Sequence, residues 1–121
     1  MSKSIKKNRA LAFESQDGKC CYCGFPMWIG SPGDYLPSRF ASKPAMNRLR
    51  CTAEHKVARV DGGPNSRRNI VAACWFCNQN RHRRPNPLSS EKYAVFVQSR
   101  VRAGKWHPPV LHTMRMYVQD G

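Results

Sequence analysis

Acidic residues are scarce in this sequence. Asp and Glu together number 7, against 21 Lys and Arg, so the formal net charge is +14. An imbalance of this size causes self-repulsion in the compact state and attracts polyanions. Nucleic acid is therefore the first candidate partner, and an anionic membrane surface is the second. The remaining interpretation is a basic protein that its charge merely keeps soluble.

Long apolar runs are lacking as well. No stretch is apolar enough to span a bilayer, and the apolar run at 10–13 is too short for the core of a signal peptide. We therefore expect an intracellular, cytoplasmic protein without membrane association. The chain holds 6 cysteines, which are not expected to form a disulfide framework in a reducing compartment. Closely paired cysteines instead indicate metal binding.

The length of 121 residues is typical of one domain, which we place at 1–121. A chain this short buries a modest core, so an additional stabilising cross-link is expected. Apolar periodicity and turn signals predict helices over 4–16, 74–84 and 91–103, and strands over 49–55 and 70–73. Pro108-Pro109 argues against helix at the start of the segment from Trp106 onward, which we leave unassigned.

Residues 25–47 contain many Pro, Gly and Ser residues, which predicts an irregular loop. Its aromatic residues are Trp28, Tyr35 and Phe40. These residues allow two interpretations, which stay open at this point. Either the loop contacts nucleic acid and adds a substrate preference, or it packs against the last helix.

Two matching cysteine pairs predict a zinc site: Cys20-x-x-Cys23 and Cys74-x-x-Cys77. Two residues between thiolates let one turn aim both sulfurs at one ion, and two such turns complete a tetrahedral site that suits Zn²⁺. A closed site of four cysteines is structural rather than catalytic. Cys21 is a less suitable ligand, because Cys21-x-Cys23 leaves only one residue between. The competing hypothesis is a redox dithiol, which usually needs a βαβ context that this sequence lacks.

The stretch that contains the two expected strands carries a sharper pattern. It runs Glu54-His55, then Gly62-Gly63, then Asn69-Ile70-Val71, then Cys74-Trp75-Phe76-Cys77-Asn78. In this order, these elements resemble the HNH nuclease motif in its zinc-containing version, over roughly 20–84. The resemblance implies an α+β fold: a small ββα-metal core at about 20–84 with a structural zinc site of four cysteines, flanked by N- and C-terminal helices. The C-terminal helical extension would occupy about 88–121.

The resemblance also implies a role for each matching residue. His55 falls where the family has its general base, which deprotonates the attacking water. Asn69 falls at the middle position, which holds the hairpin loop and orients that histidine. Asn78 and Glu54 fall at positions that hold a catalytic divalent metal. His82 resembles an extra helix histidine of the colicin-type toxin nucleases. Because the third position is Asn78 and not histidine, the chain is an H-N-N variant.

Residue spacing is consistent with these implied roles. Asn78 and His82 are four residues apart and share one helix face. Glu54 and His55 are neighbours on a strand and point to opposite sides, so one can reach a metal while the other faces a water, if the hairpin is bent. Oxygen ligands favour Mg²⁺ or Mn²⁺, whereas Ni²⁺ or Zn²⁺ becomes possible if His82 also binds.

Basic residues near the motif are expected to contact the phosphates of DNA. They are Arg67 and Arg68 in the hairpin loop, and Arg81, Arg83 and Arg84 on the helix. The sequence thus predicts a metal-dependent endonuclease that cuts DNA on one or both strands, in a bacterial or phage context. The alternative is a non-catalytic zinc-containing module that binds DNA or RNA. Monomer and homodimer stay open.

Overall fold

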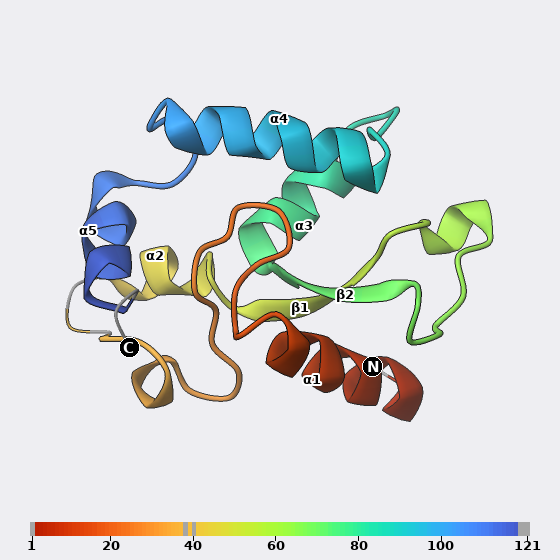
Figure 1. The fold of residues 1–121 in the computed structure, drawn as a ribbon, viewed down its shortest axis with the longest axis horizontal. Helices are drawn as coiled ribbons and strands as arrows, with labels where there is room; N and C mark the ends of the chain where they lie inside the picture. The colour runs from red at the N-terminus through yellow and green to blue at the C-terminus, as the bar shows by residue number, and fades with distance from the viewer. Residues whose placement is uncertain (1, 38, 40, 119–121) are drawn as a thin grey trace.

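An antiparallel hairpin lies at the centre of the computed structural model, which describes residues 2–37, 39 and 41–118 (Figure 1). Its strands are β1 (Cys51–His55) and β2 (Ile70–Cys74). The register pairs Cys51 with Cys74 and His55 with Ile70. Helix α1 (Lys3–Ser15) packs on one side of the hairpin and α3 (Trp75–His82) on the other (Figure 1). The sequence order β1, β2, α3 therefore forms a ββα unit.

Helix ends follow from local sequence. Helix α1 begins after Ser2, whose hydroxyl accepts a hydrogen bond from the backbone N–H of Ile5 at 3.2 Å. It ends before Asp17-Gly18, where both residues have positive φ, at 54° and 71°. Helix α3 begins directly after β2, because Cys74 serves as its N-cap and its sulfur accepts from the N–H of Cys77 at 3.4 Å. The predicted helices and strands at these positions are confirmed, with boundaries shifted by one or two residues.

Three further helices lie outside the hairpin unit: α2 (Lys43–Asn47), α4 (Ser90–Arg102) and α5 (Pro109–Val118). Within the described residues, the short 3₁₀ helices η1 (Pro32–Asp34) and η3 (Arg59–Asp61) interrupt the loops. Helix α4 begins after Ser89, whose hydroxyl accepts a hydrogen bond from the backbone N–H of Lys92 at 3.3 Å. The segment after Trp106, left unassigned from sequence, contains α5. Its Pro109 stands at the first helical position, where the missing N–H has no helical partner to lose.

The loop at 25–47 packs against the body of the protein. The indole of Trp28 donates to the carbonyl of Met46 at 2.7 Å. The ring of Phe25 is fully buried, 4.9 Å from the ring of His112 in α5. Tyr35 lies edge-on to Phe13 of α1 at 5.6 Å. The loop thus contacts α5 through Phe25 and α1 through Tyr35, which supports the packing interpretation. Phe40 lies outside the described residues.

A single cluster of buried side chains connects these elements, from Ala12 in α1 to Met114 in α5. The predicted α+β class, with a two-stranded ββα core and helices before and after it, is confirmed. Among the described helices, none combines the length and the apolar character that a bilayer crossing needs.

Candidate active site and metal centre

The four paired cysteines meet at one point of the fold. The sulfurs of Cys20, Cys23, Cys74 and Cys77 all lie within 4.8 Å of one another, and all four residues are buried. Cys20 and Cys23 flank a tight turn that closes at Gly24, where φ is 76°. Cys74 ends β2 and Cys77 lies in the first turn of α3. Cysteine pairs that lie far apart in the sequence therefore converge on one cluster.

The cluster fits a tetrahedral zinc ion. Zn–S bonds of about 2.3 Å place the sulfurs of a tetrahedron about 3.8 Å apart, and Cys23 Sγ lies 3.9 Å from Cys74 Sγ. Burial and the neighbouring thiols raise the pKa of Cys74 and Cys77. Burial also opposes ionisation of Cys20, but hydrogen bonds from the surrounding thiols outweigh it and lower the pKa of Cys20. Burial therefore opposes ionisation of these thiols, and a bound Zn²⁺ would offset that cost by stabilising the thiolates.

The segment between α4 and α5 covers the cluster with two donors. The indole N–H of Trp106 points at Cys77 Sγ at 3.3 Å. His107 Nδ1 accepts from the guanidinium of Arg48 at 3.3 Å, so its Nε2 carries the proton and donates to Cys23 Sγ at 3.4 Å. Burial, followed by the nearby Arg48 charge, lowers the pKa of His107 to about 3. A neutral His107 is therefore a permanent donor to a cysteine of the cluster.

A second centre lies at the end of β1. A cavity of about 280 Å³ is lined by Glu54, His55, Asn78 and His82, together with residues of the segment around η3. Glu54 and His55 come from β1, and Asn78 and His82 come from one face of α3. Neighbouring positions on a strand point to opposite sides, and here both residues reach the same cavity at the strand end. Four of the five residues expected in a hydrolytic site thus surround one space, and the fifth, Asn69, is not among the residues that line it.

Residues 42–84 match the model of the HNH endonuclease family. This segment, from the start of α2 to the end of α3, is thus similar to an HNH endonuclease domain. Searches among curated proteins and among solved structures gave no match. The match begins after Cys20 and Cys23. The fold brings this first cysteine pair next to Cys74 and Cys77, which lie within the matched residues. The family suggests a nuclease or nucleic-acid-binding function.

Glu54 is the most buried of the four side chains that line this cavity, with only 1% of its surface exposed. Its Oε2 accepts from the hydroxyl of Tyr22 at 2.9 Å and from the guanidinium of Arg81 at 3.1 Å. Its Oε1 lies 2.8 Å from His82 Nε2. The carboxylate is thereby fixed on one oxygen, and its other oxygen faces the partly exposed imidazole of His82.

Asn78 is oriented by the strand beside it. Its amide nitrogen donates to Thr52 Oγ1 at 3.0 Å and to the carbonyl of Ala53 at 3.2 Å. Its amide oxygen forms no hydrogen bond with the part of the chain that the structure describes, and Asn78 lines the cavity. The side chain thus keeps one oxygen available as a ligand next to Glu54.

Two asparagines shape the loop that follows His55. Asn69 accepts from the N–H of Val57 at 2.9 Å and donates to the carbonyls of Val57 and Pro64, which ties the two sides of the hairpin loop together. It makes no direct contact with the imidazole among the described residues. That contact comes from Asn65, whose Oδ1 lies 2.8 Å from His55 Nε2. Sequence reasoning missed Asn65, because asparagine is an ordinary residue after a Gly-Gly-Pro turn.

Arg81 lies in the interior of the protein, not on its surface. It is 5% exposed and donates to Glu54, to the carbonyls of His55 and Lys56, and to the carbonyl of Leu88. This burial differs from the exposed phosphate contact expected from the sequence. A basic run on a helix cannot reveal which arginine points inward, and here the residue one turn after the buried Cys77 faces the core. Arg81 therefore positions Glu54 and the end of β1.

We expect Arg81→Met to lower the free energy of unfolding by about 3 kcal/mol, because it leaves Glu54 buried without its charged partner. Urea unfolding of zinc-saturated protein, followed by circular dichroism, measures the change. The matched control is His82→Ala, which removes a more exposed partner of the same carboxylate. The side chain of His82 is 33% exposed, so the control is expected to cost about 1 kcal/mol or less. Equal costs for the two variants would contradict the positioning role of Arg81.

Proposed function

We propose that this protein is a metal-dependent endonuclease that hydrolyses phosphodiester bonds of DNA. The observation that carries the proposal is the cavity shared by Glu54, His55, Asn78 and His82 in a chain whose residues 42–84 match the HNH endonuclease family. Hydrolysis of a phosphodiester needs a base for the attacking water, a Lewis acid for the developing charge, and a means to hold the backbone. Each of these tasks has a candidate residue.

His55 acts as the general base in this proposal. An amide oxygen can only accept a hydrogen bond, so Asn65 Oδ1 keeps the imidazole proton on Nε2. The lone pair then lies on Nδ1, which makes no hydrogen bond within the described part of the chain. Nδ1 is therefore free to take a proton from water, and Asn65 stabilises the imidazolium that results. Asn69 acts indirectly, because it holds the loop from which Asn65 extends.

Glu54, Asn78 and His82 would hold the catalytic divalent ion. Adjacent ligands of an octahedral ion with bonds of about 2.1 Å lie about 3.0 Å apart, and Glu54 Oε1 lies 2.8 Å from His82 Nε2. The carboxylate and amide oxygens favour Mg²⁺ or Mn²⁺, while His82 also permits Ni²⁺ or Zn²⁺. When bound, the ion supplies charge stabilisation at the phosphate and the leaving oxygen. Zinc at the four cysteines has a structural role only.

Exposed arginines would bind the phosphate backbone around this cavity. Arg67 and Arg68 lie on the hairpin loop, and Arg83 and Arg84 lie at the end of α3, all on the surface. Arg84 also stacks on the ring of Phe96 at 4.7 Å, which fixes its direction. Arg81 is left out of this surface because it is buried.

A redox function of the cysteine pairs has less support. Reactive dithiols need a partly exposed, electropositive sulfur, whereas all four paired cysteines here are buried. The hairpin is antiparallel and lacks the βαβ arrangement that such motifs usually accompany.

The test is cleavage of supercoiled plasmid by the purified, zinc-loaded protein, with Mg²⁺, with Mn²⁺, or without an added divalent metal. Metal-dependent conversion to nicked or linear plasmid is expected, with no conversion when Mg²⁺ and Mn²⁺ are both left out. A structured RNA of equal length, incubated in parallel, tests the choice of DNA. Binding of either nucleic acid without cleavage under every metal would contradict the proposal and favour the non-catalytic zinc-containing module.

A further inference from the structure

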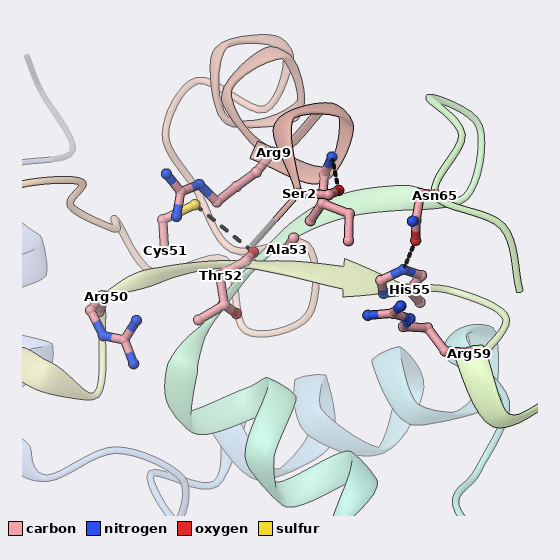
Figure 2. A pocket seen from close by; sticks show the side chains of 10 residues that line it. Ser2, Arg9, Arg50, Cys51, Thr52, Ala53, His55, Arg59 and Asn65 are labelled. Atoms are coloured by element: carbon pink, nitrogen blue, oxygen red, sulfur yellow. Dashed lines mark hydrogen bonds between the residues drawn. The ribbon is translucent and has the colours of Figure 1, made fainter. Parts of the chain in front are cut away.

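A second cavity, of about 520 Å³, also borders His55 but does not include Glu54, Asn78 or His82 in its lining. It extends along β1 and is bounded by α1 and the hairpin loop (Figure 2). Three arginines line it: Arg9 from α1, Arg50 just before β1, and Arg59 in η3. Its lining contains no Asp or Glu. Three positive charges in one hollow repel one another, which is a cost that an anionic ligand would remove.

None of the three guanidinium groups is occupied by a partner within the described part of the chain. The ion pairs found there involve Arg81 and His82 with Glu54, and no others. The Nε of Arg9 is buried and without a hydrogen-bond partner. A buried N–H without an acceptor is costly and uncommon in folded proteins. Arg9 therefore presents a donor that the protein itself does not satisfy.

The arrangement of the arginines follows the strand. Arg9 and Arg50 lie near the start of β1, and Arg59 lies near its end, beside His55 (Figure 2). The five residues of β1 span about 13 Å. A strand of duplex DNA carries one phosphate per 3.4 Å of axis, roughly. The cavity is thus long enough for more than one phosphate of a backbone, and longer than a single phosphate ion requires.

His55, Ala53 and Arg59 line both this cavity and the one with Glu54. We propose that the arginine cavity is a subsite for the sugar–phosphate backbone on one side of the bond to be cut. The cut strand would pass His55 and continue along β1, with its phosphates bound by Arg59 and then by Arg9 and Arg50. The subsite rests on the proposed nuclease function, and it assigns a substrate-binding role to α1, which precedes the residues matched by the HNH family.

The test measures binding of a fluorescent DNA duplex by anisotropy, with zinc-loaded protein in buffer without Mg²⁺ or Mn²⁺ so that cleavage is absent, across a series of salt concentrations. Wild type is compared with Arg9→Gln, Arg59→Gln and the control Arg102→Gln. Arg102 is exposed at the end of α4, a helix on the far side of the hairpin from α1 (Figure 1). Each variant removes one positive charge, so the net charge that attracts DNA decreases by the same amount in all three variants.

We expect the two subsite variants to bind roughly tenfold more weakly and to lower the slope of log K against log salt by about 1. Arg102→Gln should keep the slope of wild type. Arg59 is exposed, so Arg59→Gln decides the question if Arg9→Gln fails to fold. If the subsite variants have the affinity and the salt slope of the control, the subsite proposal is wrong. Salt-dependent binding by wild type in that case still supports the nuclease proposal. A wild-type protein that binds no nucleic acid overturns both.

Discussion

His55→Ala is expected to reduce the rate of plasmid cleavage by on the order of 10³-fold, the usual contribution of a positioned general base. Asn65 holds the imidazole of His55 in a defined tautomer at the edge of the cavity, with Nδ1 left to accept a proton. Initial rates of conversion of supercoiled plasmid, with saturating Mg²⁺ or Mn²⁺, measure the loss. A rate within tenfold of wild type, roughly, would show that another group accepts the proton.

Three further measurements separate a lost base from a damaged protein. His55→Ala should keep its zinc content, its unfolding midpoint, and its affinity for DNA in buffer without Mg²⁺ or Mn²⁺. Asn65→Ala provides an intermediate comparison. It leaves the imidazole of His55 in place but removes the oxygen that accepts the hydrogen bond from Nε2. This variant should lose activity to a smaller extent, roughly tenfold. An Asn65 variant as inactive as His55→Ala would assign the asparagine a more direct role.

Cys77→Ser is expected to unfold the protein. A structural zinc site contributes on the order of 10 kcal/mol, which is comparable with the whole stability of a small domain. The cluster joins β2, α3 and the turn after α1, so these elements should separate together. Zinc content by elemental analysis and near-ultraviolet circular dichroism measure the effect. Removal of zinc from wild type with a strong chelator should give the same spectrum.

Cys21→Ser is the matched control for that loss. Cys21 lies next to Cys20 in sequence but outside the cluster. We expect the control to retain one zinc per chain and to fold. Loss of zinc in Cys21→Ser together with retention in Cys20→Ser would instead assign the ligand to Cys21.

The ββα core was predictable because its signals are local and ordered. Cys20-x-x-Cys23, the turn at Gly62-Gly63 and the helix after Cys74 each specify a short piece of backbone. Their order then fits one arrangement. The position of α5 was not predictable, because Pro108-Pro109 excludes helix interior but not the first turn of a helix. Its partner Phe25 lies far earlier in the chain, and a single sequence contains no sign of that contact.

The ligand residues of the candidate site were predictable from the sequence, but the residues that orient them were not. Spacing alone places Asn78 and His82 on one helix face. The residues that orient these ligands do so through hydrogen bonds. Asn65 bonds to His55, Tyr22 and Arg81 bond to Glu54, and His107 bonds to Cys23. Each of these contacts depends on the tertiary path of the chain. Arg81 illustrates the difficulty, since it stands among exposed basic residues and only packing determines that it points inward.

Cys74 has three structural roles: it ends β2, it pairs with Cys51 across the hairpin, and it belongs to the cysteine cluster. A strand that slips by one residue exchanges its two faces. Such a slip of β2 would move the side chain of Cys74 to the other face of the hairpin and out of the cysteine cluster. A zinc ion bound by the four cysteines would therefore hold β2 in the register that pairs Glu54 with Val71 and His55 with Ile70.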